Sequence, residues 1–473
     1  MNARPPKLLF FVENPTSFQH LARSKLLPLL SSKEGFDCTV VLPPSLDPSP
    51  SERERLAGVK FRLLDIHQLR PRDWLGKTLK KAVHVISRDL LTVHAPHATL
   101  SQDRRHQLRQ RGKNLDFRVG YAHLLKRIGL SWRHLSRAAQ NFGFYPEIAE
   151  ILDEVRPDCV IYFNILIGQM DFLREVKRRG IPLILDMPNW DQASSKGPMT
   201  VLPDHVFVWS EFIKKDFCEI HHFSPERVHP IGVLQFDWYF QGNQTLTREE
   251  FCRLHHIDPA AKIVLYAYGQ PPGIKACDPF VNEILGIIGD NQLGFPCHLI
   301  FRASPRVAFP SALRERKGIT VQHPLGHEAP DRIGWIPSAE EDRMRMSTLL
   351  HSDVVINIFS TMCLDALCLR KPVINIGYVC GRDESLPNLM ERFFTYTHVI
   401  PVIRSSATWI PRNRAELDQA LSEALRKPES RQDTARELLQ EICGPADGKS
   451  YLRWLDAFHQ VRACEAGKTG AKP

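Results

Sequence analysis

Short apolar runs alternate with amphipathic stretches along nearly the whole chain. This alternation predicts strands separated by helices, and so βαβ units that build a mainly parallel sheet with helices on both faces. In the first half the predicted strands are residues 7–12, 38–42, 60–65, 159–163, 182–186, 205–209 and 227–231, and the predicted helices are residues 18–30, 146–155, 170–179 and 211–221.

The pattern breaks at residues 232–247, whose aromatic and then polar sequence is typical of a linker. A second series follows, with predicted strands at residues 263–267, 297–301, 354–358 and 373–376 and predicted helices at 343–351 and 361–369. A chain of 473 residues is too long for one hydrophobic core. We therefore predict an α/β protein with two Rossmann-like parallel-sheet domains, residues 1–235 and 236–445, that face a cleft at the carboxyl ends of their strands.

The composition is that of an ordinary soluble protein, with 43% hydrophobic and 24% charged residues. The 11 cysteines form no CxxC pair, which favours buried, reduced thiols over a disulfide framework. The first residues, MNARPPKLLFFVENP, lack the apolar core of a signal peptide, and no apolar stretch is long enough to span a membrane. We expect a cytoplasmic protein.

Positive charge is concentrated in residues 68–137, which hold 16 lysines and arginines against 4 acidic residues. That surplus of 12 exceeds the net charge of +9 of the whole chain. The segment mixes apolar with basic residues and is too long for a simple connection, so we expect a basic helical insertion at about residues 68–140. Three interpretations stay open: docking on the inner face of an anionic membrane, a solvated helical face, or nucleic-acid binding, for which no recognition motif is present.

A predicted buried strand at residues 354–358 leads directly into Ser360 and Thr361. Their hydroxyls suit the N-terminus of the next helix as caps, and the free N–H groups of such an end suit a diphosphate. Asp365 follows Thr361 by one helical turn, and its carboxylate can accept hydrogen bonds from the hydroxyls of a ribose. An ordinary strand-to-helix connection, with Ser360 as a structural cap, is the alternative interpretation.

Residues 365–373, DALCLRKPV, resemble the GT-B glycosyltransferase segment in which an acidic residue is followed seven positions later by proline. The resemblance implies that Asp365 holds the ribose of a nucleotide-sugar and that the preceding helix end holds its phosphates. The Ser-Thr pair also resembles the CDP-glycerol glycerophosphotransferase-like group, which shares this fold. The chain departs from the pattern in having Asp rather than Glu, and in the basic pair Arg370-Lys371.

Three other segments resemble parts of the same fold family. Residues 223–237, FSPERVHPIGVLQFD, resemble the passage that ends the first domain, where Gly232 allows a close backbone approach at the hinge and the donor. Residues 447–450, DGKS, resemble the motif before the last helix, which implies that residues 446–473 pack back on the first domain and end in a frayed tail. Residues 301–306, FRASPR, resemble a strand end in which Arg302 reaches a donor phosphate, although Ser304 replaces the usual histidine.

Residues 189–198, NWDQASSKGP, resemble a Trp-Asp-x-x-Ser/Thr-Ser-Lys-Gly loop of bacterial surface-carbohydrate transferases. The loop follows the predicted strand at residues 182–186 and therefore stands at a strand carboxyl end. We expect it to contribute Trp190, Asp191, Ser194, Ser195, Lys196 and Gly197 to the site. A long polar loop without a catalytic role is the alternative.

Glycosyl transfer without a metal ion requires groups that stabilise the leaving diphosphate and a base that removes the proton of the acceptor hydroxyl. The first task is assigned to Ser360, Thr361, Arg302 and Lys275. The base is expected in the first domain, which favours inversion, and the candidates are Asp191, Glu13, Asp186 and His20. No acidic pair of the DxD type stands out, so we assign no metal ligand and expect no cofactor beyond the nucleotide-sugar donor.

Taken with the resemblance, these features predict an inverting GT-B glycosyltransferase that moves a sugar from a nucleotide-sugar donor to a glycan or lipid-linked acceptor. The resemblance places this reaction in surface-polysaccharide biosynthesis, such as that of capsule or lipopolysaccharide. The partners expected are the donor, the acceptor and a peripheral anionic membrane, with no nucleic acid. The alternatives are a CDP-alditol phosphotransferase, a nucleotide-sugar epimerase and a non-catalytic binding subunit of the same fold.

Overall fold

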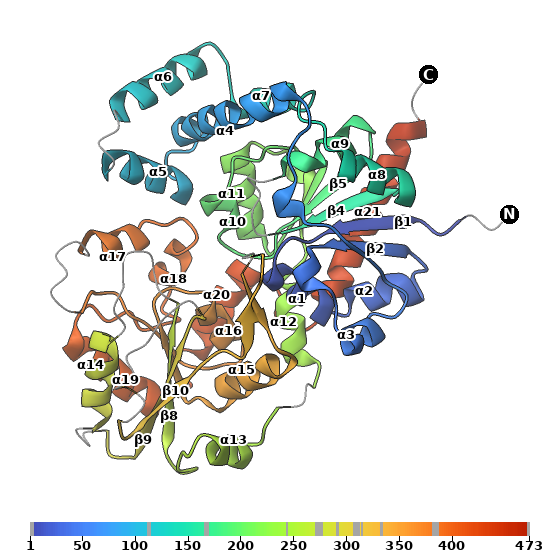
Figure 1. The fold of residues 1–473 in the computed structure, drawn as a ribbon. Helices are drawn as coiled ribbons and strands as arrows, with labels where there is room; N and C mark the ends of the chain where they lie inside the picture. The colour runs from blue at the N-terminus through green and yellow to red at the C-terminus, as the bar shows by residue number, and fades with distance from the viewer. Residues whose placement is uncertain are drawn as a thin grey trace. The chain divides into compact units, whose positions relative to one another are not determined.

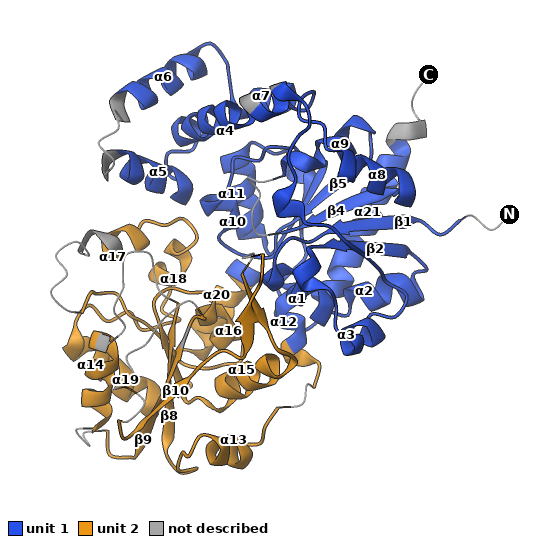
Figure 2. Cartoon of the chain, viewed as in Figure 1, with its two compact units in different colours: residues 1–238, 442–473 blue, residues 239–441 orange. Residues whose placement is uncertain are grey.

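The computed structural model describes residues 4–110, 115–164, 170–242, 245–269, 278–289, 293–305, 313, 316–331, 334–380 and 387–470. The chain divides into two compact units (Figure 2). Unit 1 comprises residues 1–238 and 442–473, and unit 2 comprises residues 239–441. The chain passes from unit 1 to unit 2 after residue 238 and returns to unit 1 at residue 442.

Unit 1 is built on a seven-stranded parallel sheet of order β3-β2-β1-β4-β5-β6-β7. The strands are β1 (Lys7–Phe11), β2 (Asp37–Leu42), β3 (Lys60–Leu63), β4 (Cys159–Phe163), β5 (Leu183–Asp186), β6 (His205–Val208) and β7 (Val228–Pro230). All seven strands predicted for this half are present. The strand order reverses between β1 and β4, so the topological switch point of this sheet, where α/β proteins bind ligands, lies at the carboxyl ends of these two strands.

Helices cover the sheet of unit 1 (Figure 1). They are α1 (Pro15–Arg23), α2 (Leu26–Pro28), α3 (Pro50–Arg55), α8 (Pro146–Val155), α9 (Arg174–Arg178), α10 (Gln192–Ser195), α11 (Glu211–His221), α12 (Leu234–Asp237) and α21 (Ser450–Gly470). The single helix predicted at residues 18–30 is wrong, because Ser24 ends α1: its hydroxyl donates to the Leu21 carbonyl at 2.7 Å and accepts the Leu26 N–H at 3.3 Å. A π-helical turn, Leu29–Lys33, follows α2.

The C-terminal helix α21 packs on the sheet of unit 1. Its Trp454 is fully buried, with its ring centroid 6.3 Å from that of Phe10 in β1 and 5.3 Å from that of Phe207 in β6. Burial of so large an aromatic side chain stabilises the docked helix. The helix extends to Gly470, beyond the start of the tail that the sequence pattern predicts as frayed.

The basic segment between β3 and β4 is helical where the structure describes it. Its helices are α4 (Trp74–His94), α5 (Thr99–Gln110), α6 (Leu115–Arg127) and α7 (Trp132–Ala139). Buried Asp89 in α4 joins three of them, because it pairs with Arg104 of α5 at 3.2 Å and also with Arg118 of α6. A buried carboxylate held between two arginines is satisfied only when all three helices are in place.

Unit 2 holds a five-stranded parallel sheet of order β10-β9-β8-β13-β14. The strands are β8 (Lys262–Tyr268), β9 (Cys297–Ala303), β10 (Ile319–Gln322), β13 (Val354–Asn357) and β14 (Val373–Asn375), and β11 (Gly326–Glu328) and β12 (Trp335–Pro337) form a hairpin. The helices are α13 (Arg248–Leu254), α14 (Asp278–Gly289), α15 (Ala339–His351), α16 (Met362–Cys368), α17 (Pro387–Phe393), α18 (Ile400–Arg404), α19 (Arg414–Arg426) and α20 (Gln432–Cys443). Here the switch point lies between β8 and β13. The prediction of two Rossmann-like parallel-sheet domains is confirmed.

Candidate functional site

The switch point of unit 1 is lined by polar residues that directly follow β1 and β4. Asn14 caps α1, because its Oδ1 atom accepts the N–H of Ser17 at 2.9 Å. The side-chain amide of Asn14 donates to Oδ1 of Asn164, and that of Asn164 donates to the hydroxyl of Tyr162 at 2.9 Å. This chain of hydrogen bonds holds the two strand ends together around Glu13.

Glu13 is buried, with 2% of its surface exposed. Burial raises the pKa of its carboxyl to about 8, against the hydrogen bonds from Tyr162 and Asn164 and the charge of Lys80, which lower it. Its Oε1 atom has no hydrogen-bond partner among the described residues. Burial likewise raises the pKa of Tyr162 well above its usual value, so this hydroxyl keeps its proton and remains a donor to Glu13. Once ionised, such a carboxylate is a stronger base than an exposed one.

Glu13 opens on a cavity of about 460 Å³. The other residues of its wall are Ile66, His67, Leu69, Arg70, Lys80, His84, Tyr145, Asp171 and Phe172. Asp171 is paired with Lys80 at 3.2 Å and with Arg174 at 2.6 Å. Arg70 donates to the backbone carbonyls of His67 and Leu69, at 2.9 and 2.8 Å, and neither bond pairs its positive charge with a carboxylate. With Glu13 protonated at neutral pH, the wall carries an excess of positive charge.

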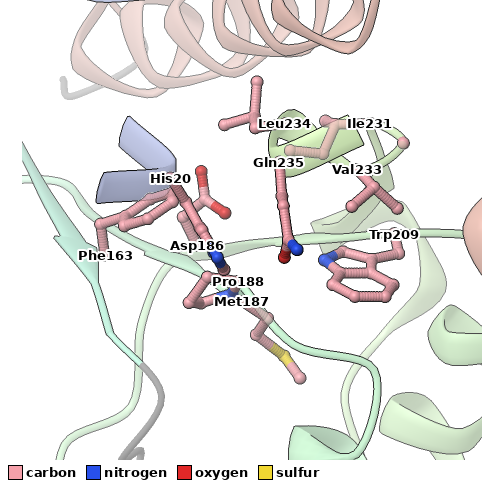
Figure 3. Close-up of a pocket in the computed structure, with 11 residues that line it drawn as sticks. His20, Phe163, Asp186, Met187, Pro188, Trp209, Ile231, Val233, Leu234 and Gln235 are labelled. Carbon is pink, nitrogen blue, oxygen red and sulfur yellow. The ribbon is translucent and has the colours of Figure 1, made fainter. Parts of the chain in front are cut away.

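His20 and Asp186 lie together around a different and much smaller cavity (Figure 3). Its volume of about 10 Å³ is room for a single water molecule. Asp186 is buried and accepts the indole N–H of Trp454 at 2.6 Å, and burial raises its pKa to about 7 against that hydrogen bond. A sugar hydroxyl has no room beside these two side chains, so the geometry favours Glu13 as the base.

The loop at residues 189–198 turns its polar side chains on itself. Asp191 accepts a hydrogen bond from the hydroxyl of Ser195 and lies 3.5 Å from the amine of Lys196, while the hydroxyl of Ser194 donates to the carbonyl of Asp191 at 3.4 Å. Trp190 is buried, and Gly197 has a φ of 104°, which favours glycine. Gln192 donates to the carbonyl of Asn164 at 2.8 Å, so the loop is held beside the end of β4.

Gly232 packs against the start of α21. Its φ is 83°, and a Cβ atom there would lie 2.6 Å from Oγ of Ser450 and 2.9 Å from a guanidinium nitrogen of Arg453. Asp237 accepts the backbone N–H groups of Ser450 and Tyr451, at 2.9 and 2.8 Å, and so caps the helix. The close approach expected at Gly232 is therefore made to the C-terminal helix, and its contact with a donor stays a prediction.

At the switch point of unit 2, Gly269 follows β8 and Ser360 follows β13. A Cβ atom on Gly269 would lie 3.7 Å from that of Ser360, so the two loops touch. The expected capping by the hydroxyls of Ser360 and Thr361 is wrong. Instead Asn357, at the end of β13, accepts both the N–H and the hydroxyl of Ser360, at 3.0 and 3.3 Å, and the Thr361 side chain makes no cap bond.

Asp365 lies in the first turn of α16, buried beside Tyr239 and Arg345. The hydroxyl of Tyr239 donates to its Oδ1 atom. Burial and the nearby Asp365 raise the pKa of Tyr239 well above its usual value, so this hydroxyl stays a donor. Burial lowers the pKa of the Arg345 guanidinium, but the nearby Tyr239 and Asp365 have the larger combined effect, so the pKa of Arg345 is raised. A ribose hydroxyl at Oδ1 would take the place of Tyr239.

Arg302 is only 6% exposed and bridges neighbouring elements of unit 2. It donates to Gln322 of β10 at 2.8 Å and pairs with Glu341 of α15. Burial lowers its pKa, against the charge of Glu341. A phosphate would meet Arg302 only by displacing Glu341, so these contacts favour a structural role. Lys275 lies outside the residues that the structure describes.

The structure adds residues to the site that sequence analysis missed. Tyr239 lies within the predicted linker, where its aromatic ring gave no sign of a bond to Asp365. Asn164 ends the strand sequence YFN, and a polar residue directly after a buried strand is the signal that marks it. Arg70, Lys80 and Asp171 come from separate segments and meet only in the folded cavity.

One group of side chains in the described part of the chain can hold a metal ion. The ligand atoms of His205, Cys464 and Glu465 lie within 4.8 Å of one another. His205 begins β6, so this group lies at the amino ends of the strands, opposite the edge that carries Glu13. Among the described residues, no helix is both long and apolar enough to cross a membrane.

Comparisons with known proteins support the fold. No family model matches the chain, and no curated protein matches its sequence. The structure of MnaA from S. aureus with UDP has a TM-score of 0.54 and 10% identity, over 97% of each chain. A UDP-GlcNAc 2-epimerase from Neisseria meningitidis, bound to UDP-GlcNAc, also has a TM-score of 0.54, with 11% identity over 96% of this chain and 100% of that one. The wall teichoic acid polymerase TagF has a TM-score of 0.49 and 9% identity, over 98% of this chain and 91% of that one.

The chain has the GT-B fold. At such low identities the likeness concerns architecture alone, and it confirms the fold that the motif resemblance implies. In this GT-B chain, the carboxyl at the switch point of unit 1 and the Gly269–Ser360 contact at the switch point of unit 2 occupy the positions where open α/β sheets bind ligands. Activity has to be argued from those side chains.

Proposed function

We propose that this protein is a glycosyltransferase that moves a sugar from a nucleotide-diphosphate donor to a hydroxyl of a glycan or lipid-linked acceptor in surface-polysaccharide biosynthesis. The observation that carries the proposal is buried Glu13, which lines a cavity of about 460 Å³. Its carboxyl has a raised pKa, and its Oε1 atom has no hydrogen-bond partner among the described residues. This volume is ample for a sugar, since ligand pockets begin at about 300 Å³.

In the proposed reaction Glu13 is the general base. Its carboxylate takes the proton of the acceptor hydroxyl as the oxygen attacks the anomeric carbon, and the bond to the nucleoside diphosphate breaks. Attack opposite the leaving group inverts the anomeric centre. The proton rests on Glu13 and is returned to water, and no step requires a metal ion.

The donor is assigned to unit 2. The contact of Gly269 with Ser360 at its switch point suits close approach of a diphosphate, and Asp365 is the carboxylate proposed to hold the ribose. The fold supports a nucleotide donor, because proteins of the same architecture bind UDP and UDP-GlcNAc. Those two ligands are the first to test.

The acceptor is expected to carry negative charge. Arg70 lines the cavity and donates to backbone carbonyls of His67 and Leu69 rather than to a carboxylate, and Asp171 is shared by Lys80 and Arg174. An acceptor carboxylate or phosphate would balance this excess, which favours an acidic glycan.

Nucleotide-sugar epimerisation is the second candidate, because the Neisseria meningitidis protein of this fold is a 2-epimerase bound to UDP-GlcNAc. An epimerase converts its donor without an acceptor, whereas a transferase consumes donor only when an acceptor is present. The cavity beside Glu13 favours transfer, since an epimerase needs no second substrate pocket.

The test begins with a thermal-shift screen of UDP-, GDP-, CMP-, CDP- and dTDP-linked donors, followed by product analysis with a bound donor and an acidic acceptor glycan. We expect Glu13→Gln to lower transfer by about 100- to 10,000-fold while donor binding is retained. Asp216→Asn is the matched control, because that carboxyl also has a pKa raised to about 7 by burial but lines neither cavity of the site.

Four outcomes would contradict the proposal. Full activity of Glu13→Gln would remove Glu13 as the base. A product with a phosphodiester would show a phosphotransferase, and conversion of donor without acceptor would show an epimerase. Donor binding without turnover on any acceptor would indicate a non-catalytic subunit.

A further inference from the structure

Helix α6 carries a continuous apolar stripe on the surface of unit 1. Its members are Phe117, Tyr121 and Leu124, and it continues to Ile128, which directly follows the helix and whose N–H still bonds to the Leu124 carbonyl; their exposed fractions are 70%, 41%, 58% and 72%. At 3.6 residues per turn these positions fall within an arc of about 60° and extend over about three turns. They therefore form one ridge along the helix rather than scattered exposed residues.

The stripe is not the face by which α6 packs on its own unit. That task belongs to Arg118, Val119, Ala122 and Leu125, which are half-buried or buried. Arg118 donates to buried Asp89 of α4 at 2.9 Å, and Ala122 is fully buried. In Figure 1, α6 lies at the edge of the helical group, with α4 between it and the sheet. An exposed apolar ridge on the side of a helix that faces away from its own unit is typical of an interaction surface.

Basic residues surround this ridge. Lys126 and Arg127, at the end of α6 and next in sequence to Ile128, are exposed. Residues 68–137 together hold 16 basic against 4 acidic residues. The partner must therefore combine an apolar interior with a negatively charged surface. Nucleic acid fits less well, because it offers no apolar phase for Leu124 and Ile128, which cannot stack on bases as aromatic rings do.

We propose that α6 docks this protein on an anionic lipid bilayer. The ridge enters the boundary between headgroups and acyl chains, and the lysines and arginines beside it lie among the lipid phosphates. The inference does not depend on Glu13 or on the reaction. It accounts for the presence of a helical insertion of this size and charge between β3 and β4 in the chain.

The test is co-sedimentation of the full chain with vesicles of phosphatidylcholine, with and without one third phosphatidylglycerol. We expect binding to the anionic vesicles only, with weaker binding as salt is raised because the attraction is screened. Replacement of two ridge residues, Leu124→Ser with Ile128→Ser, should lower the partition coefficient by about tenfold or more, since two exposed aliphatic side chains no longer leave water.

The control is Leu254→Ser with Leu452→Ser, because these leucines are 53% and 38% exposed outside the ridge. This variant should bind vesicles as the parent does, and thermal melts of both double variants should match the parent. The proposal is overturned if the ridge variant binds vesicles as strongly as the parent, or if the parent binds neutral vesicles as well as anionic ones. It is also overturned if the parent self-associates or binds an RNA probe and the ridge substitutions abolish that binding instead.

Discussion

Trp454, in the last helix, donates its indole N–H to the buried carboxyl of Asp186, at the end of β5, over 2.6 Å. The bond joins residues 268 positions apart in the chain. It gives the C-terminal helix a polar anchor in addition to its apolar contacts with Phe10 and Phe207. Because the same carboxyl has a pKa raised to about 7, this anchor also makes the stability of unit 1 depend on pH.

We expect Asp186 to reduce the free energy of unfolding as pH rises. Its pKa is about 7 in the folded protein against 3.8 for an ordinary aspartate, so the stability that it contributes is full below about pH 4 and is lost as pH rises through 7. Asp186→Asn keeps an acceptor for Trp454 and cannot ionise. In urea melts, the free energy of unfolding should fall less between pH 5 and pH 8 for the variant than for the parent. An equal fall in both proteins would mean that a group other than Asp186 titrates.

A second pH dependence should appear in the rate. The carboxyl of Glu13 has a pKa of about 8, and a base acts only when ionised, so kcat/KM should rise with pH and level off above about 8. Glu13→Asp, which shortens the side chain, should show the same rise of kcat/KM with pH but at a lower rate throughout. A rate that is level between pH 6 and 9 would argue against Glu13 as the base.

Gly232→Ala should destabilise unit 1 by about 1–3 kcal/mol, because alanine is strained at a positive φ and its Cβ would meet Ser450. Gly242→Ala is a useful comparison, since Gly242 also has a positive φ but no atom lies within 4 Å of its added Cβ. The difference between the two variants in thermal melts isolates the collision with α21. Equal melting temperatures of the two variants would mean that Ser450 and Arg453 move aside for the added Cβ at no cost in stability.

The charge of the cavity makes a prediction about the acceptor. Arg70→Gln should raise KM for an acidic acceptor by about tenfold, as expected for loss of one charge-assisted hydrogen bond, and should leave kcat nearly unchanged. KM for the donor should not change, because the donor is assigned to unit 2. Equal effects on a neutral and an acidic acceptor would show that Arg70 acts through the shape of the cavity.

Much of the fold was predictable because its signal is local. Helices Pro146–Val155 and Glu211–His221 and strand Cys159–Phe163 have the bounds that the apolar pattern predicts. Strand β10 was missed because ITVQ is short and half polar, and the break at Ser24 was missed because a single serine hydroxyl decides it.

The site was predictable in part. Glu13 was a candidate because it follows the first predicted strand, and the structure places it at the switch point of unit 1. Its position at a strand end follows from the order of elements along the chain, which the sequence shows. The cap at Ser360 was wrong, since the Ser360 hydroxyl donates to Asn357, three residues earlier, and no side chain caps the helix. The cavity wall and the bond between Tyr239 and Asp365 join distant segments, and no local pattern encodes such contacts.

That bond allows the ribose assignment to be tested against a purely structural role. If Asp365 holds the ribose, Asp365→Asn should weaken binding of the nucleotide found in the screen by about 10- to 100-fold, the effect of losing a hydrogen bond to a charged group. Tyr239→Phe removes the hydroxyl that occupies Oδ1 and should leave this affinity unchanged or increase it. If Asp365 serves only Tyr239 and Arg345, both variants should instead lower the melting temperature alike, with no change in nucleotide affinity by calorimetry.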